Sequence, residues 1–157
     1  MPKAPSVKPI VCEYLFYKLH GSHSVKWFKI PLVEIRLKSK EAEFGSVALV
    51  DSGSDRTFLP RQEAELLGLK PQIGQNGEPV KVEAIGAGGS FPCDVMTLPD
   101  LRLMHHGKPF QDFHGLNVWV PNMTEDIPYA ILGRDYVFHR YEIAFDEGRR
   151  KISFRKV

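Results

Sequence analysis

The chain has 157 residues, a length that suits one domain with a single hydrophobic core. Hydrophobic residues make up 43% of it and charged residues 25%, which is typical of an ordinary globular protein. Its net charge of +2 gives no electrostatic sign of nucleic-acid binding, and we find neither a signal-peptide core nor an apolar run of membrane-spanning length. We therefore expect a cytoplasmic protein that binds neither nucleic acid nor a membrane.

The first 30 residues are predicted to form an arm and an extra hairpin, and residues 31–157 a single domain. Residues 1–9 contain three prolines and show no periodicity, so we expect a loose arm. Two segments that alternate in polarity, residues 13–19 and 25–30, flank a turn at Gly21 and Ser22 and so predict a hairpin.

Residues 32–50 are predicted to form two strands around a charged turn. Residues 32–37 alternate with a period of two, which places Val33, Ile35 and Leu37 on one face. Residues 47–50 are small or β-branched and apolar, as in a strand that is buried on both faces.

That second strand ends at Asp51, and Ser52, Gly53 and Ser54 follow it. A carboxylate at the end of a buried strand is costly unless donors meet it, and the small residues allow backbone N–H groups to approach closely. An Asp before Ser-Gly can equally be a simple turn initiator that caps its own backbone. A calcium loop would need more acidic positions, and a phosphate loop would need a Gly-Lys-Ser/Thr ending that is absent.

The middle of the chain is predicted to contain a short helix and a glycine-rich hairpin. Residues 60–67 begin with proline, carry early acidic residues and are followed by Gly68 at a C-cap position. Residues 80–85 and 91–96 read as strands around a flexible tip at residues 86–90. Residues 105–107 read as a loop.

Residues 127–138 form the second informative run, in which an apolar strand stops at Gly133 and gives way to a short helix through Arg140. Residues 141–146 and 151–154 predict a closing hairpin. With about eight strands, two short helices and no βαβ rhythm, the chain is predicted to be mostly β with a small closed or folded sheet.

Neither cysteines nor histidines predict a metal site. Cys12 and Cys93 are far apart and read as reduced core thiols. Histidines such as His105 and His106 lack a carboxylate or cysteine companion at the usual ligand spacing. We therefore expect no metal and no cofactor.

Three features in this order resemble the retropepsins, the retroviral-type aspartic proteases: residues 48–55, the glycine-rich hairpin, and residues 131–135. The resemblance covers roughly residues 32–154. The hairpin comes later after Asp51 than in the compact viral enzymes, and the C-terminal hairpin is an extension, which is closer to cellular retropepsin-like domains. The resemblance implies a small, closed, barrel-like acid-protease fold that is homodimeric.

The resemblance also implies roles for individual residues. Asp51 would be the catalytic carboxylate, and the Ser52 hydroxyl would bond across a two-fold axis. Support for the site would come from Ser52, Gly53, Ser54, Asp55 and Arg134, with Asp55 and Arg134 as an ion pair. Substrate binding, with the hairpin as a flap, would fall to Phe58, Ile85, Gly86, Gly88, Gly89, Tyr129 and Ile131.

Aspartic protease chemistry needs two facing carboxylates, whereas Asp-Ser/Thr-Gly occurs once in this chain. An active enzyme must therefore be a homodimer that pairs Asp51 with Asp51 of the second copy and hydrolyses peptide or protein substrates through an activated water. The alternative is a catalytically silent dimer of the same fold that binds peptides or serves as a scaffold. A more distant alternative is a monomeric β protein in which Asp51 only caps a turn.

Overall fold

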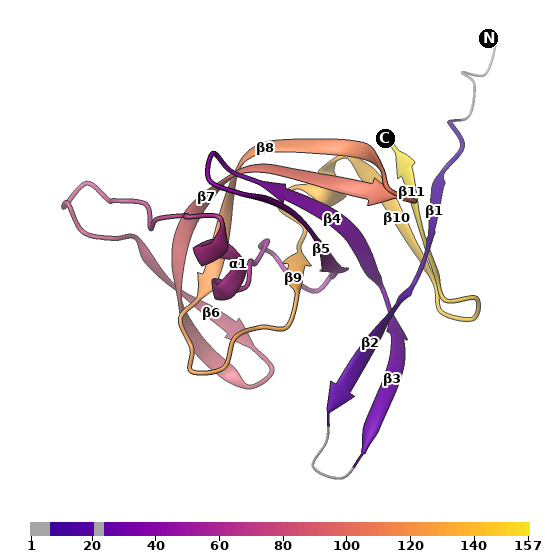
Figure 1. Ribbon diagram of the computed structural model, residues 1–157, viewed down its shortest axis with the longest axis horizontal. Helices are drawn as coiled ribbons and strands as arrows, with labels where there is room; N and C mark the ends of the chain where they lie inside the picture. Colours follow the sequence, from indigo (N-terminus) through magenta and orange to yellow (C-terminus); the bar gives the residue numbers. More distant parts are fainter. Residues whose placement is uncertain (1–6, 21–23) are drawn as a thin grey trace.

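A six-stranded sheet forms the body of the protein in the computed structural model, which describes residues 7–20 and 24–157 (Figure 1). The strand order is β6-β7-β4-β5-β9, and β8 pairs with β7. All of these pairs are antiparallel except β5 with β9, which is parallel. The strands are β4 (Leu32–Lys38), β5 (Glu43–Val50), β6 (Lys81–Gly86), β7 (Gly89–His105), β8 (Lys108–Pro121) and β9 (Ala130–Leu132).

The core lies where alternating strand residues face inward. Val33, Ile35 and Leu37 of β4 are all buried, as their period of two predicts, and Glu34 between them is exposed. β7 and β8 contribute the largest apolar share, including Leu98, Leu101, Leu103, Leu116, Val118 and Val120.

The prediction of a closed, barrel-like sheet is wrong, because no strand of the described chain joins β8 to β9. Between these two strands lies a single extended residue, Phe58, which forms isolated bridges to Trp119 and Ile131. The chain bends at Asp55 and Arg56, and Pro60 immediately after Leu59 has no backbone N–H to continue a ladder. The sheet therefore stays open at this point.

A second sheet joins the two end regions of the described chain. β10 (Tyr141–Asp146) and β11 (Lys151–Lys156) form the predicted closing hairpin. β1 (Ile10–Glu13) adds to the other edge of β11 in an antiparallel register, which the sequence did not predict. Ile152 and Phe154 of β11 are buried against the core.

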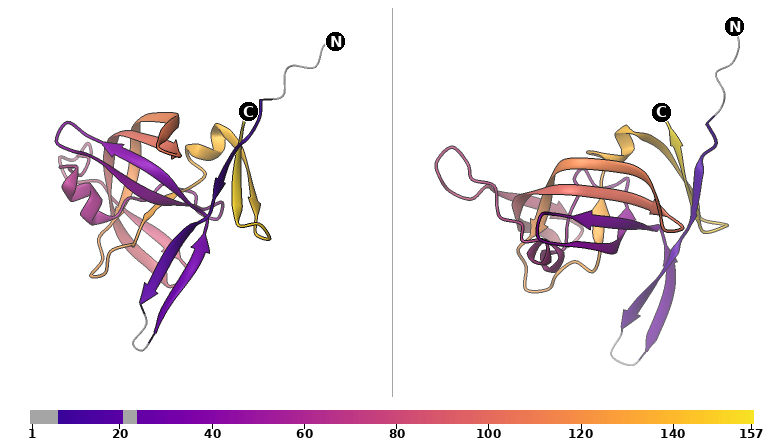
Figure 2. Two further views of the ribbon diagram at one scale, coloured as in Figure 1. Left: turned by 45° about the vertical axis from the view of Figure 1, so that its right-hand side comes forward. Right: turned by 45° about the horizontal axis from the view of Figure 1, so that its top comes forward.

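The hairpin of β2 (Leu15–His20) and β3 (Val25–Ile30) projects away from the body and forms a two-stranded sheet of its own (Figure 2). This confirms a hairpin in the predicted place, although its predicted turn at Gly21 and Ser22 lies outside the described residues. The division of the chain at residue 30 stays a prediction.

One α-helix and one short 3-10 helix complete the described part of the chain. α1 (Arg61–Leu66) begins after Pro60, and Gly68 behind it adopts φ +65°, as a C-terminal cap requires. The Asp126 carboxylate accepts hydrogen bonds from the N–H groups of Arg61 and Gln62, both at 2.9 Å. The second predicted helix is η1 (Val137–His139). Neither helix has the length or apolar character needed to cross a bilayer.

Candidate active site

Asp51 lies at the point where the only parallel strand pair of the described sheet ends. Its backbone N–H donates to the Leu132 carbonyl at 3.0 Å, one position beyond the pairing of Val50 with Leu132. Because parallel strands end at the same edge, Asp51 is placed beside Gly133 of the second informative run. The two sequence runs therefore meet in space, although about 80 residues separate them.

The turn after Asp51 holds its carboxylate with a backbone donor. The Gly53 N–H donates to Asp51 Oδ1 at 2.9 Å, and the Ser54 N–H donates to the Asp51 carbonyl at 3.2 Å. Asp51 is half-buried, whereas Ser52 and Gly53 are exposed. One carboxylate oxygen is thus fixed by the turn, and the side chain remains partly open to solvent.

Gly133 permits the close packing of this turn against β9. A Cβ at Gly133 would overlap the Arg56 carbonyl and would lie 2.7 Å from the Ser54 carbonyl oxygen. The next residue, Arg134, donates its backbone N–H to that same Ser54 oxygen at 2.8 Å, and the Ser54 hydroxyl donates to the Arg56 carbonyl at 2.7 Å. The Leu-Gly-Arg run therefore holds the turn mainly through its backbone.

Two side-chain pairs connect the same segments. The Arg134 guanidinium contacts the Asp55 carboxylate, as the resemblance implied, and both side chains are exposed. Asp135 makes the more buried connection, because it accepts hydrogen bonds from the Thr57 hydroxyl at 2.6 Å and from the Thr57 N–H at 3.0 Å. Thr57 is 2% exposed. The resemblance implies no role for Asp135, although this residue directly follows the Gly-Arg pair.

A cleft of about 360 Å³ opens beside the Asp51 turn. Of the predicted site residues it is lined by Gly53, Ser54, Asp55, Phe58 and Ile85, and the sequence did not predict its other lining residues, Arg56, Glu83, Ala84 and Trp119.

Aromatic contacts shape this cleft. Phe58 packs edge-on against Trp119 with ring centroids 5.9 Å apart, and the Arg56 guanidinium lies 5.4 Å from the Trp119 ring centroid. Phe91, from the strand that follows the flap tip, lies 6.3 Å from Phe58 by ring centroids. The cleft therefore offers an apolar wall with one cation at its edge.

The predicted flap is the hairpin of β6 and β7. Gly86 pairs with Gly89, Gly88 lies in the two-residue turn between them, and Gly89 has φ +110°, which favours glycine. Ile85 is 88% exposed. The three glycines do not line the cleft, so Ile85 is the predicted flap residue that does.

Tyr129 and Ile131 lie on the β9 side of Asp51 and do not line the cleft either. Ile131 exchanges two backbone hydrogen bonds with Phe58, both at 2.9 Å. Tyr129 packs edge-on against Tyr17 of the β2–β3 hairpin, with ring centroids 5.2 Å apart. Burial raises the pKa of the Tyr129 hydroxyl, and negative charge at Tyr17 and Asp51 raises it further. Through its contact with Tyr129, Tyr17 lies at the border of the predicted site.

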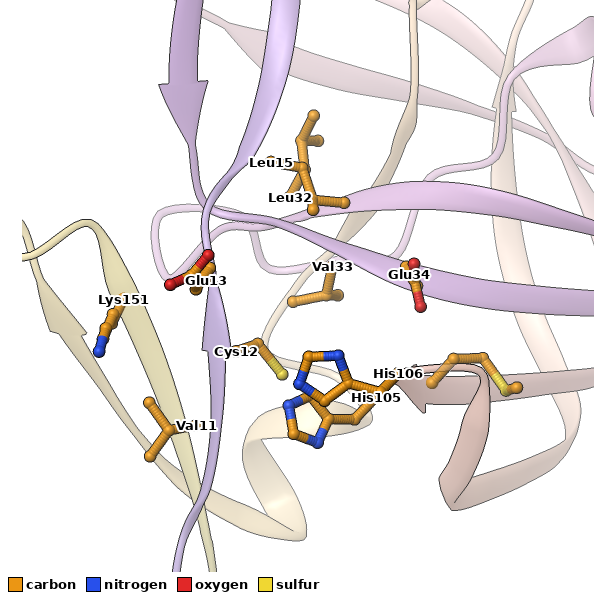
Figure 3. A pocket seen from close by; sticks show the side chains of 11 residues that line it. Val11, Cys12, Glu13, Leu15, Leu32, Val33, Glu34, His105, His106 and Lys151 are labelled. Carbon is orange, nitrogen blue, oxygen red and sulfur yellow. The ribbon is translucent and has the colours of Figure 1, made fainter.

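Another cavity, of about 480 Å³, lies away from Asp51 between β1, β4 and the turn that joins β7 to β8 (Figure 3). Cys12, His105 and His106 line it, and the two imidazole centroids are 4.0 Å apart. Burial, with a smaller contribution from Glu34, raises the pKa of the Cys12 thiol to about 11, so this thiol stays protonated at neutral pH. Within the described residues no three His, Cys, Asp or Glu side chains gather as a metal site requires.

Comparisons with known proteins agree with this geometry. A family model described as Aspartyl protease matches residues 33–136. Among solved structures, the chain is similar to a retropepsin-like aspartic protease from Rickettsia conorii, with a TM-score of 0.51 and 12% sequence identity over 99% of this chain and 98% of that one. At this identity the likeness shows a shared fold. No curated protein matches the chain.

Proposed function

The chain belongs to the aspartyl protease family, and from this premise we propose that it is an aspartic endopeptidase that is active as a homodimer. The observation that carries the proposal is the Asp51 turn, in which a carboxylate held by the Gly53 N–H at 2.9 Å stands beside an open cleft. The sequence contains this Asp-Ser-Gly turn once, so the second carboxylate of the dyad comes from a second copy.

Two Asp51 carboxylates at close range share one proton, because two like charges at such a separation do not both ionise readily. The ionised carboxylate takes a proton from a water held between the two, and the protonated carboxylate donates a hydrogen bond to the scissile carbonyl. The water oxygen adds to the carbonyl carbon and gives a tetrahedral intermediate. A proton passed from the dyad to the amide nitrogen then allows the C–N bond to break and release a carboxyl and an amine product, without a covalent enzyme intermediate. Ser52, next to Asp51 and exposed, is the residue proposed to bond across the two-fold axis.

The substrate in this proposal is an extended peptide that the flap covers. A strand-like peptide between the flap and the Asp51 turn forms main-chain hydrogen bonds, and side-chain pockets set the cleavage preference. Phe58 and Trp119 in the cleft, with Ile85 above it, favour apolar side chains. Residues 31–157 would carry the protease domain, and residues 1–30 the added arm and hairpin.

The test is incubation of the wild-type protein and the Asp51→Asn variant with a diverse peptide library from acidic to neutral pH, with mass-spectrometric readout. We expect cleavage by the wild type and none by Asp51→Asn, which should remain a folded dimer. Asp112→Asn is the matched control, because Asp112 is a surface carboxylate that pairs with Arg102 on the β7–β8 hairpin. Turnover by Asp51→Asn at the wild-type rate would refute the proposal.

A catalytically silent dimer that binds peptides is the second candidate, and the apolar cleft is the observation in its favour. This candidate predicts that wild type and Asp51→Asn capture the same library peptides and that neither converts them. Peptide capture measured on the same samples therefore separates the two candidates.

A further inference from the structure

The β2–β3 hairpin stands apart from the rest of the described chain. It forms a separate two-stranded sheet, and all views show it extending from the body (Figures 1 and 2). Strands of six residues reach about 20 Å. A two-stranded hairpin alone is at best marginally stable in water, so contacts along its length are needed to keep it formed.

The outer face of the hairpin carries exposed aromatic residues among lysines. In the antiparallel register Phe16 lies opposite Lys29, and Lys18 lies opposite Trp27. Phe16 is 62% exposed and Trp27 is 60% exposed, and their rings meet edge-on with centroids 6.3 Å apart. Isolated exposed apolar residues are common, whereas a paired aromatic patch on a projecting element indicates an interaction surface.

The inner face connects the hairpin to the candidate active site. Tyr17 and Phe28 lie opposite one another on this face, and Tyr17 packs on Tyr129, which precedes the strand that pairs with β5 below Asp51. Phe28, directly across from Tyr17, is still 43% exposed. The hairpin is therefore anchored at the border of the site and rises beside it with its apolar side chains uncovered.

The position of the site indicates which partner covers the hairpin. If the dyad is shared, a second copy must cover the surface around Asp51, and the hairpin stands at the edge of that same surface. Phe16, Trp27 and Phe28 each bury on the order of 150–250 Å² when fully covered, and only about half of that area is still exposed in this chain. Two such hairpins would supply roughly half of the 1,200–2,000 Å² or so that a stable interface buries.

The charge of the hairpin also favours a second copy of the chain as its partner. Residues 15–30 include Lys18, Lys26 and Lys29 and no acidic residue. A fitting partner surface combines apolar and acidic side chains. The chain itself offers this combination near the site, at exposed Met123 and Glu125 in the loop that leads to Tyr129.

We propose that the β2–β3 hairpin is a dimerisation arm that packs against a second copy of this chain. This inference rests on the proposed homodimeric function and assigns a surface to it. By isologous symmetry each arm lies on the other subunit, so the interface contains two equivalent arm contacts that flank the two Asp51 residues.

The test compares the dimer dissociation constants of full-length variants by sedimentation equilibrium. The arm variant combines Phe16→Ser with Trp27→Ser. The control combines Leu66→Ser with Ile73→Ser, two apolar residues that are also exposed but lie on α1 and in the loop before β6. We expect the arm variant to raise the dissociation constant at least tenfold and to lose activity at low concentration, and the control to match wild type.

A dissociation constant unchanged in the arm variant would overturn the inference and leave the proposed function standing. A wild-type dimer that cleaves no peptide would overturn the proposed function. The dissociation constant of the arm variant would still test the role of the hairpin in dimerisation. Thermal unfolding at one protein concentration checks that the arm variant folds. Amide hydrogen exchange of the wild type needs no substitution, and protection of residues 15–20 and 24–30 should rise with the dimer fraction.

Basic and aromatic residues on a hairpin could also meet a lipid surface, and the same proteins decide this point. Two results together would overturn the proposed dimerisation role and assign the hairpin to a membrane surface. They are co-sedimentation with phosphatidylserine vesicles that depends on Phe16 and Trp27, and an unchanged dimer dissociation constant.

Discussion

Gly133 is the residue whose neighbours most restrict the Asp51 turn. A methyl group there would overlap the Arg56 carbonyl, and a backbone atom cannot turn aside as a side chain can. Gly133→Ala should lower the free energy of unfolding by about 1–3 kcal/mol or more, measured by urea denaturation. Gly45→Ala is the control, because nothing lies within 4 Å of a Cβ at Gly45. Equal midpoints for both variants would contradict the account of Gly133.

The neighbouring residues Arg134 and Asp135 should differ sharply in their contribution to stability. Asp135→Ala leaves the buried Thr57 hydroxyl and N–H without their acceptor, which should cost about 1–3 kcal/mol. Water already reaches Asp55 when Arg134 is present, so Arg134→Ala should lower the free energy of unfolding by at most about 1 kcal/mol. Urea denaturation of both variants at one protein concentration measures the difference, and a larger effect of Arg134→Ala would contradict it.

Glu63 should make stability depend on pH. Burial raises its pKa above the usual 4.5, the hydrogen bond from the Ser46 hydroxyl partly lowers it, and the charge of Asp126 raises it. The folded state then binds this proton more tightly than the unfolded chain, so stability should fall as pH rises from about 4.5 through the folded pKa. The loss arises because the ionised carboxylate, whose Oε2 is buried without a partner, is poorly solvated in the fold.

Glu63→Gln should therefore be more stable than wild type at neutral pH, and the difference should shrink toward pH 4. Urea unfolding at several pH values, with Glu65→Gln on the exposed side of α1 as control, measures this. Parallel stability curves for wild type and Glu63→Gln would count against the burial effect.

At the scale of elements, the flap offers the clearest functional prediction. Ile85 is 88% exposed, so its side chain can gain contacts only when the flap covers a substrate. Burying such a side chain contributes about 1.5–3 kcal/mol, so Ile85→Ser should lower kcat/KM by roughly ten- to a hundredfold and leave the melting temperature unchanged. Ile73→Ser, an exposed apolar residue outside the cleft, should leave kcat/KM unchanged. An unaltered kcat/KM for Ile85→Ser would remove Ile85 from the substrate site.

Elements with a strong local pattern could be predicted from the sequence. The alternation of β4, the glycine tip of the β6–β7 hairpin and the turn of the closing hairpin are local signals, and the structure confirms all three elements. The pairing of β1 with β11 was missed because four residues at the edge of a sheet have little pattern, and their partner lies far along the chain. At residues 105–107 the sequence predicts a loop, whereas β7 and β8 extend to a tight turn at His106 and Gly107.

The candidate site was predictable to the extent that its residues are adjacent in sequence. The Asp51 turn and the Leu132–Gly133–Arg134 run carry their own signals, and the structure brings them together. Trp119 and Tyr17 reach the site from other strands, and only tertiary packing shows this. Closure of the sheet could not be judged from strand patterns, because it depends on whether residues beside Phe58 pair or turn.

At the scale of the whole molecule, a shared dyad predicts that inactive subunits lower the activity of wild-type subunits, because the two form mixed dimers with a single Asp51. Adding an equal amount of Asp51→Asn to wild type and allowing exchange leaves about a quarter of all dimers with two Asp51 residues. Peptidase activity per mole of wild-type subunit should then fall to about half. Adding Asp112→Asn instead should raise total activity, and activity that ignores added Asp51→Asn would indicate that each subunit works alone.

The parallel pairing of β5 with β9 has a further consequence for the order of events during synthesis. Thr57 and its acceptor Asp135 are 78 residues apart, and the Asp51 N–H depends on Leu132 in the same way. A nascent chain that has released the Asp-Ser-Gly turn from the ribosome therefore lacks the strand that holds it, and long-range pairings of this kind form slowly. The carboxylate acquires its final environment only after β9 and Asp135 have been synthesised, which delays assembly of the dyad until this later part of the domain can fold around it.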